Sequence, residues 1–122
     1  MSTFFYDSYA FIEYFRGNTG FKSYFEEHAG MTTIFNVAEI YYSVLHEKGK
    51  GIADDILTTL WSQVVDIDRP VLQKAMVFRF LHPKKKLSYA DCIGYETACS
   101  RNILFLTGDM QFKDFPQVEF VK

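Results

Sequence analysis

Apolar residues along the chain occur in two patterns, which predict alternating strands and helices. The runs at 3–6 and 103–106 are short, mostly apolar and followed by polar residues, as in strands that are buried on both faces. Between them, apolar residues recur three and four positions apart, which is the spacing of a helix packed on a core. We expect strands at 3–6, 31–35, 63–67, 103–106 and 118–121, and helices at 8–16, 21–28, 37–48, 52–62, 70–82 and 88–100.

Strands separated by helices indicate the fold class. Such an order predicts an α/β protein, a three-layer α/β/α sandwich with a central, mainly parallel sheet. The 122 residues fit one compact domain, so we expect a single domain over residues 1–122. Hydrophobic residues make up 48% and aromatic residues 18% of the chain, which is typical of a folded globule with apolar surface left over for a partner.

Charge and cysteine content limit the classes of function. The formal net charge is -2, so the chain as a whole does not attract a polyanion, and binding of nucleic acid would depend on local patches. Cys92 and Cys99 lie on one expected helix, about 10 Å apart along its axis, and cannot form a disulfide with each other there. Free thiols, together with the lack of a long apolar run, predict a cytoplasmic protein that does not enter a membrane.

Four acidic residues are expected at one edge of the sheet. Ligands of parallel α/β sheets bind beyond the carboxyl ends of the strands, where helices also begin. Asp7 and Asp109 each follow an expected strand directly, and two more acids lie in the first turns of expected helices. The sequence therefore predicts a rim of four carboxylates: Asp7, Glu39, Asp91 and Asp109.

Each of these acids also has an ordinary structural interpretation. Asp7 and Asp109 could be N-caps or turn residues that accept hydrogen bonds from backbone N–H groups. Glu39 and Asp91 occupy the third helical position of two capping-box patterns, N-V-A-E and S-Y-A-D. Their expected placement on one rim, rather than any single residue, favours a shared function.

Crowded carboxylates need a neutralising charge. Helix N-termini offset only ~0.3 to 1 kcal/mol of repulsion per charge, and no Lys or Arg lies beside these acids in the local sequence. The pattern therefore predicts a bound divalent metal ion. A site made only of oxygen ligands suits Mg²⁺ or Mn²⁺ better than Zn²⁺.

Four segments of the chain together resemble the PIN domain, and in particular the small single-domain toxins of VapBC-type toxin-antitoxin pairs. Each segment alone is a weak motif, but their order and spacing are specific and extend over almost the whole chain. The segments are YDSYAFIEYFRGN, NVAEIYYSVL, LSYADCIGYETA and ILFLTGDMQF.

The resemblance implies a ribonuclease whose metal-binding acids are Asp7, Glu39, Asp91 and Asp109, with Asp7 and Asp91 as the principal ligands. One or two Mg²⁺ or Mn²⁺ ions would activate a water molecule for hydrolysis of an RNA phosphodiester. Ser8 and Thr107 are expected to hydrogen-bond to these carboxylates, although turn or cap roles remain open for both. The chain departs from many relatives at Gln111, where an acid is common.

RNA also requires positive charge near the acids. Lys84, Lys85 and Lys86 precede the helix of Asp91, and Arg16 ends the first helix, so these four are candidates for contacts with flanking phosphates. A solvated lysine loop is the alternative. The resemblance further implies a homodimer and an antitoxin partner, which would lay a helix on aromatic side chains of the first two expected helices, residues 8–16 and 21–28.

Three other functions are alternatives to this one. A phosphoryl-transfer receiver or phosphatase would need an acid pair or a D-x-D pattern in the first loop and a lysine at a strand end, and the segment after the first strand, D-S-Y, provides neither. A catalytically inactive PIN-fold binding module is compatible with Gln111. The third is a purely structural α/β domain with well-capped helices.

Overall fold

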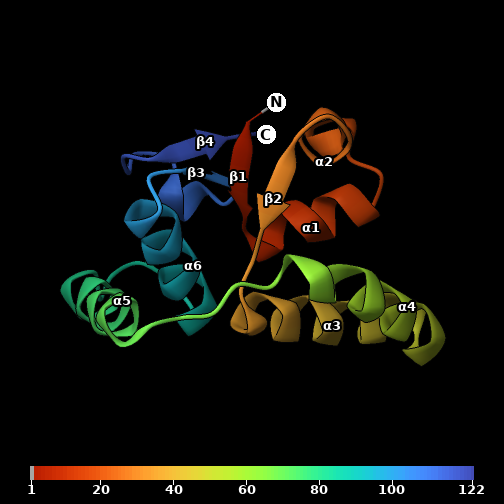
Figure 1. The fold of residues 1–122 in the computed structure, drawn as a ribbon, viewed down its shortest axis with the longest axis horizontal. Helices are drawn as coiled ribbons and strands as arrows, with labels where there is room; N and C mark the ends of the chain where they lie inside the picture. Colours follow the sequence, from red (N-terminus) through yellow and green to blue (C-terminus); the bar gives the residue numbers. More distant parts are fainter. Residues whose placement is uncertain (1) are drawn as a thin grey trace.

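The computed structural model describes residues 2–122, and its centre is a four-stranded parallel sheet. The strand order is β2-β1-β3-β4, and every neighbouring pair runs parallel (Figure 1). Phe5 lies in register with Met31 on one side and with Phe105 on the other. The strands are β1 (Thr3–Tyr6), β2 (Ala29–Met31), β3 (Leu104–Thr107) and β4 (Val118–Phe120).

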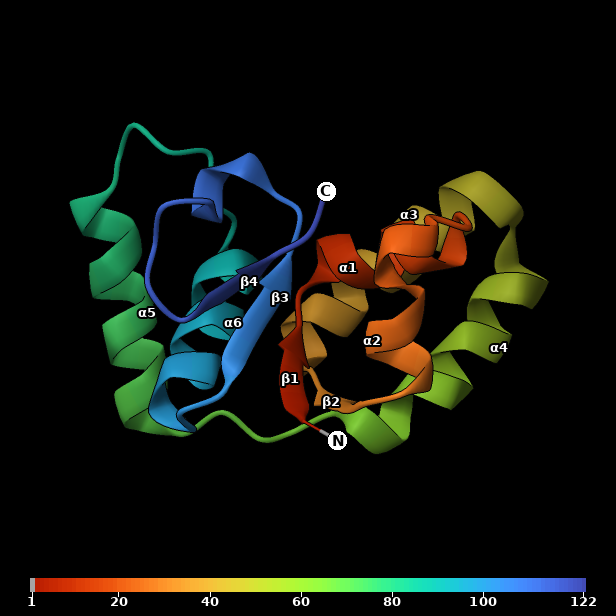
Figure 2. The same cartoon turned by 90° about the horizontal axis from the view of Figure 1, so that it is seen from above.

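Helices cover both faces of this sheet. Figure 2 shows α5 and α6 on one side of the strands and α1 to α4 on the other. The expected three-layer α/β/α sandwich is therefore confirmed. The helices are α1 (Ser8–Phe15), α2 (Lys22–Glu26), α3 (Ile34–Lys48), α4 (Lys50–Leu60), α5 (Arg69–Leu81) and α6 (Tyr89–Ser100), with 3-10 turns η1 (Thr19–Phe21), η2 (Trp61–Gln63) and η3 (Met110–Phe112).

The alternation of side chains in β1 divides the core into two halves. Phe4 and Tyr6 point to the face covered by α1 to α4, where they pack with Phe11 and Ile40. Phe5 points to the opposite face and packs with the buried side chains of α6 and β3. Successive residues of a strand face opposite sides of a sheet, so the three buried aromatic residues of β1 place it in contact with both helical layers.

The predicted strand at 63–67 is wrong. Within residues 2–122, Val64 forms only an isolated bridge with Thr32, and Asp68 already caps α5 by accepting a hydrogen bond from the Val71 N–H at 2.9 Å. Val64 packs in one half of the core and Ile67 in the other. The segment is therefore a connection that crosses from the layer of α4 to the layer of α5 (Figure 2), and its apolar residues reflect this crossing.

The predicted strand at 31–35 is wrong in its boundaries. The strand β2 ends at Met31, because Thr33 caps α3 and the helix begins at Ile34 rather than near residue 37. The helix expected at 21–28 is also shorter, since residues 19–21 form a 3-10 turn before α2. None of the helices in residues 2–122 combines the length and the apolar character that a membrane span requires.

Candidate metal centre

Asp7 and Asp109 lie at the carboxyl ends of the two central strands. Asp7 follows β1 and caps α1, and Asp109 follows β3 by two residues and caps η3. The Asp7 N–H donates to the carbonyl of Leu106 at 3.1 Å, which joins the ends of the two strands. The chain turns to opposite sides of the sheet after β1 and β3, so this is the position at which ligands of parallel sheets bind.

Thr107 connects these two acids. Its hydroxyl donates to Asp7 Oδ2 at 2.7 Å and accepts from the Asp109 N–H at 3.0 Å. Asp7 is almost completely buried, and its Oδ1 accepts from the Ser8 N–H at 2.8 Å. The intervening Gly108 is required because a Cβ there would lie 2.4 Å from the Val121 carbonyl oxygen. The T-G-D turn thus fixes Asp109 relative to Asp7.

Glu39 reaches the same rim through Ser8. The Ser8 hydroxyl donates to Glu39 Oε1 at 2.8 Å and accepts from the Asn36 side-chain amide at 3.0 Å. Asn36 is fully buried, and its Oδ1 accepts from the Thr33 hydroxyl at 2.6 Å. The predicted N-x-x-E capping box is therefore wrong, because Thr33 is the N-cap of α3 and Asn36 lies inside the helix.

The sequence interpretation missed the positioning role of Asn36 and Thr33. The signal that could have revealed it is the pattern T-x-x-N, in which a Thr stands three residues before the Asn. The buried Asn36 donates to the Ser8 hydroxyl, which donates to the Glu39 carboxylate, so these polar groups satisfy one another. This chain of hydrogen bonds orients Glu39.

Asp91 occupies the capping box that the sequence predicted for α6. Its Oδ2 accepts from the Ser88 N–H at 2.8 Å, and its own N–H donates to Ser88 Oγ at 3.0 Å. These bonds hold the carboxylate at the first turn of α6. The helix packs against β1 and β3, and the charge of Asp91 in its first turn acts on Asp7 at the carboxyl end of β1.

The four acids act on one another electrostatically. Burial raises the pKa of Asp7 well above its ordinary value, and the charges of Asp91, Glu39 and Asp109 raise it further, against the lowering effect of the Thr107 hydroxyl. Burial likewise raises the pKa of Asp91 to about 6; the Ser88 N–H opposes this rise, and the charges of Glu39 and Asp109 add to it. The structure therefore brings all four predicted acids within range of one another's charge.

No positive side chain in the described part of the chain forms an ion pair with the four acids. The ion pairs among residues 2–122 join Arg16 to Glu13 and Glu47, and Lys50 to Asp54, and none includes the four acids. Like-charged carboxylates that share a rim without a cation favour protonation or a bound cation.

The donor set fits a divalent ion in its chemistry. Within residues 2–122, Glu39 Oε2, Asp91 Oδ1 and Asp109 Oδ2 accept no hydrogen bond, so each retains a free carboxylate oxygen. Carboxylate oxygens are the ligands that Mg²⁺ and Mn²⁺ prefer. In the same described part of the chain, however, no three His, Cys, Asp or Glu side chains converge closely enough to hold an ion as they stand. Binding would have to draw the side chains closer together.

The lysine loop lies beside Asp109. Lys85 Nζ donates to the Gln111 carbonyl at 3.0 Å, and the Lys86 N–H donates to Gln111 Oε1 at 3.2 Å. The Gln111 N–H in turn donates to Asp109 Oδ1 at 2.9 Å. Lys84 and Lys86 are exposed. Gln111 thus ties the lysine loop to the acidic rim.

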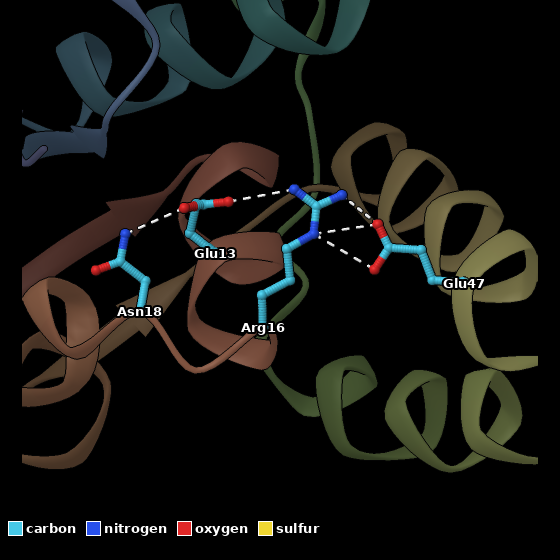
Figure 3. A network of polar contacts seen from close by, with 4 residues as sticks. All are labelled: Glu13, Arg16, Asn18 and Glu47. Atoms are coloured by element: carbon cyan, nitrogen blue, oxygen red, sulfur yellow. Dashed lines mark hydrogen bonds and ion pairs between the residues drawn. The ribbon is translucent and has the colours of Figure 1, made fainter.

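Arg16 lies apart from this rim. It forms the C-cap of α1, whereas Asp7 caps the N-terminus of that helix. Its guanidinium donates to Glu47 of α3, with Nε to Oε1 at 3.1 Å, and to Glu13 at 3.2 Å (Figure 3). Asn18 completes the network by donating to Glu13 at 3.1 Å. Two carboxylates share the charge of Arg16, and its contact with RNA stays a prediction.

Comparisons with known proteins agree with this fold. The sequence pattern of the PIN domain family matches residues 4–118. A toxin-antitoxin complex from Klebsiella pneumoniae contains a chain that is 18% identical, with a TM-score of 0.72 over 98% of this chain and 96% of that one. VapC20 of Mycobacterium tuberculosis, a toxin that cleaves the sarcin-ricin loop, is 15% identical, with a TM-score of 0.77 over 95% and 98%.

A third similar structure is VapBC2 from Rickettsia felis bound to a DNA fragment from its promoter. Its matching chain is 14% identical, with a TM-score of 0.74 over 98% of this chain and 99% of that one. A search of curated proteins found no match to the sequence.

Proposed function

The chain belongs to the PIN domain family, and on that premise we propose that it is a metal-dependent endoribonuclease and the toxin of a toxin-antitoxin pair. The observation that carries the proposal is the mutual repulsion of Asp7, Glu39, Asp91 and Asp109, which no salt bridge within residues 2–122 relieves. The similarity in fold to VapC20, a toxin that cleaves RNA of the sarcin-ricin loop, supports the choice of substrate class.

The four carboxylates would hold Mg²⁺ or Mn²⁺, with Asp7 and Asp91 as the principal ligands. The ion, when bound, would activate a water molecule and neutralise charge on the phosphate. The protein's own contribution is orientation, because Thr107 holds Asp7 and Ser8 holds Glu39. Hydrogen bonds that fix a ligand's orientation in this way tune its affinity for the metal.

Lys84, Lys85 and Lys86 are proposed to bind phosphates that flank the cleaved bond. Their loop contacts Gln111 beside Asp109, and Lys84 and Lys86 extend into solvent. Arg16 remains a weaker candidate, since Glu13 and Glu47 already bind it. Local positive charge is what an acidic protein needs in order to bind RNA.

Partners and compartment follow from the same proposal. We propose an antitoxin protein as the cognate partner, because two of the similar folds come from toxin-antitoxin assemblies. A homodimer and a cytoplasmic location are proposed with it, the latter in accord with two unpaired cysteines, Cys92 and Cys99. We also propose that residues 1–122 act as one domain.

A catalytically inactive PIN-fold binding module is the second candidate. It is favoured by the cap hydrogen bonds that engage Asp7, Asp91 and Asp109, and by Gln111, whose amide oxygen accepts from a backbone N–H. In such a module the rim would cap helices and nothing more.

RNA cleavage distinguishes the two candidates. Purified protein should cleave RNA when Mg²⁺ or Mn²⁺ is added and should stop when EDTA is present. Asp7→Asn and Asp91→Asn should abolish cleavage, whereas Asp55→Asn, an exposed acid on α4, should leave it unchanged. Thermal unfolding of each variant would show that the fold is intact. Equal cleavage in EDTA, or no cleavage with either metal, would contradict the proposed function.

A further inference from the structure

A pocket opens next to the acidic rim, between the first turns of α3 and α6. Its volume is about 420 Å³, and its lining includes Phe35, Glu39, Arg79, Ser88 and Tyr89. Glu39 belongs to the rim, and Ser88 bonds to Asp91. The pocket, called here the Tyr89 pocket, is therefore continuous with the proposed metal centre.

Two aromatic rings line the Tyr89 pocket and remain accessible. Phe35 is 41% exposed and Tyr89 is 60% exposed, although most aromatic side chains of the chain pack in its core. Each ring lies in the first turn of its helix and is absent from both core clusters. An exposed aromatic ring in a groove beside a nuclease centre is a surface on which a nucleobase can stack.

Arg79 provides the positive charge of the Tyr89 pocket. Its Nε donates to the Leu87 carbonyl at 2.9 Å, and its guanidinium carbon lies 4.7 Å from the centre of the Tyr89 ring. These contacts orient the guanidinium. No carboxylate within residues 2–122 forms an ion pair with it. An oriented and unpaired guanidinium is suited to bind a phosphate through two parallel hydrogen bonds.

We infer that the Tyr89 pocket binds one nucleotide of the RNA substrate next to the scissile phosphate, with its base stacked on Tyr89 and Phe35 and a phosphate bound by Arg79. This inference rests on the proposed function. The aromatic rings match the base, the guanidinium matches the phosphate, and Glu39 on the wall places the nucleotide beside the acids. The volume lies within the range of pockets that hold small ligands.

Binding of RNA without metal tests the inference separately from cleavage. The wild-type protein in EDTA is titrated into a short fluorescent single-stranded RNA, and the Kd is read from anisotropy. Tyr89→Ala and Phe35→Ala should each raise the Kd between about fivefold and 100-fold, since loss of one stacked base has an effect of this order. Tyr89→Phe keeps the ring and should retain the wild-type Kd.

The helix α5 provides the test variant for the phosphate contact, at Arg79, and two controls, at Phe80 and Arg69. Phe80→Ala removes an aromatic ring that is 81% exposed and does not line the Tyr89 pocket, and it should leave the Kd unchanged. Arg79→Gln should weaken binding and reduce its dependence on salt, whereas Arg69→Gln, at the start of the same helix, should do neither. An RNA that carries 4-thiouridine should crosslink to Phe35 or Tyr89.

Several results would overturn the inference. The first is an unchanged Kd in both Tyr89→Ala and Phe35→Ala, and the second is no RNA binding by the wild type. The third is a change in the oligomeric mass of these two variants in solution, relative to the wild type, without a change in their Kd for RNA. The last result would assign the Tyr89 pocket to a contact between two copies of the chain. If the aromatic variants lose RNA binding but the wild type cleaves no RNA with either metal, the proposed function fails while the pocket assignment holds.

Discussion

Thr107 donates its hydroxyl hydrogen to Asp7 over 2.7 Å, although the two residues lie 100 positions apart in the chain. The same hydroxyl accepts from the Asp109 N–H, so one side chain joins the ends of β1 and β3. Asp7 is the most deeply buried of the four acids. The bond lowers its pKa against burial and repulsion, and thereby favours the ionised form that a metal ion requires.

Replacement of Thr107 by valine should weaken both the fold and the metal site. Thr107→Val keeps the shape of the side chain but leaves Asp7 and the Asp109 N–H without their partner. We expect the free energy of unfolding to fall by about 1 to 3 kcal/mol. The affinity for Mn²⁺ should fall about 10- to 100-fold. Urea unfolding and Mn²⁺ titration measure the two effects, and Thr107→Ser, which retains the hydroxyl, is the control.

Stability of the metal-free protein should fall as the pH rises. Asp91 has a pKa of about 6 in the folded state, above the ordinary value of 3.8, so the folded state binds more protons than the unfolded state between these values. The free energy of unfolding therefore decreases from about pH 4 to about pH 7. Chemical unfolding in EDTA across this range measures the slope.

Asp91→Asn should flatten this pH dependence and raise the stability at neutral pH. Asparagine retains an oxygen that can accept from the Ser88 N–H, but it carries no charge to repel Glu39 and Asp109. A slope of the opposite sign in the wild type, or an unchanged slope in Asp91→Asn, would show that the acids do not repel one another as described.

The lysine loop and Arg16 should differ in their effect on RNA binding. Lys84→Gln and Lys86→Gln each remove an exposed charge near Asp109 that has no ion pair within residues 2–122. For single-stranded RNA, each lost phosphate contact should reduce the slope of log affinity against log salt by about 0.7. Arg16→Gln should have a smaller effect, because Glu13 and Glu47 already share that charge. Affinities measured at a series of salt concentrations provide the comparison. A larger effect of Arg16→Gln than of the lysine variants would contradict the prediction.

Gly94 should resist replacement although it lies in mid-helix. A Cβ on Gly94 would lie 2.8 Å from the Phe5 ring and 3.3 Å from the Phe105 ring, and both rings are fully buried. Gly94→Ala should therefore destabilise the fold by about 1 to 3 kcal/mol, as overpacking of a core does. For Gly51 in α4, no neighbouring atom of residues 2–122 lies within 4 Å of the same position, so Gly51→Ala should stabilise by up to about 1 kcal/mol. Thermal unfolding of the two variants gives the contrast.

The placement of Asp7 and Asp109 could be predicted because it follows from topology alone. Any residue that follows a parallel strand lies at the same edge of the sheet, whatever the details of packing. The capping box of Asp91 was also predictable, since S-Y-A-D is a local pattern with local hydrogen bonds.

The start of α3 could not be predicted from local patterns. Thr33 and Asn36 both suit an N-cap, and the choice between them depends on Ser8, which reaches Asn36 from another helix. The strand predicted at 63–67 failed for a related reason, because apolar residues in a connection between layers resemble those of a short strand. The Tyr89 pocket is invisible in the sequence, since it forms only where α3, α5 and α6 meet.

Titration of Mn²⁺ into metal-free protein, followed by calorimetry, tests most directly whether the acidic rim is a metal centre. The wild type should bind Mn²⁺ saturably, and Asp7→Asn and Asp91→Asn should each lose most of this binding, whereas Asp55→Asn should bind as the wild type does. The account would be contradicted if the wild type did not bind Mn²⁺ saturably, or if Asp7→Asn and Asp91→Asn bound Mn²⁺ as strongly as the wild type.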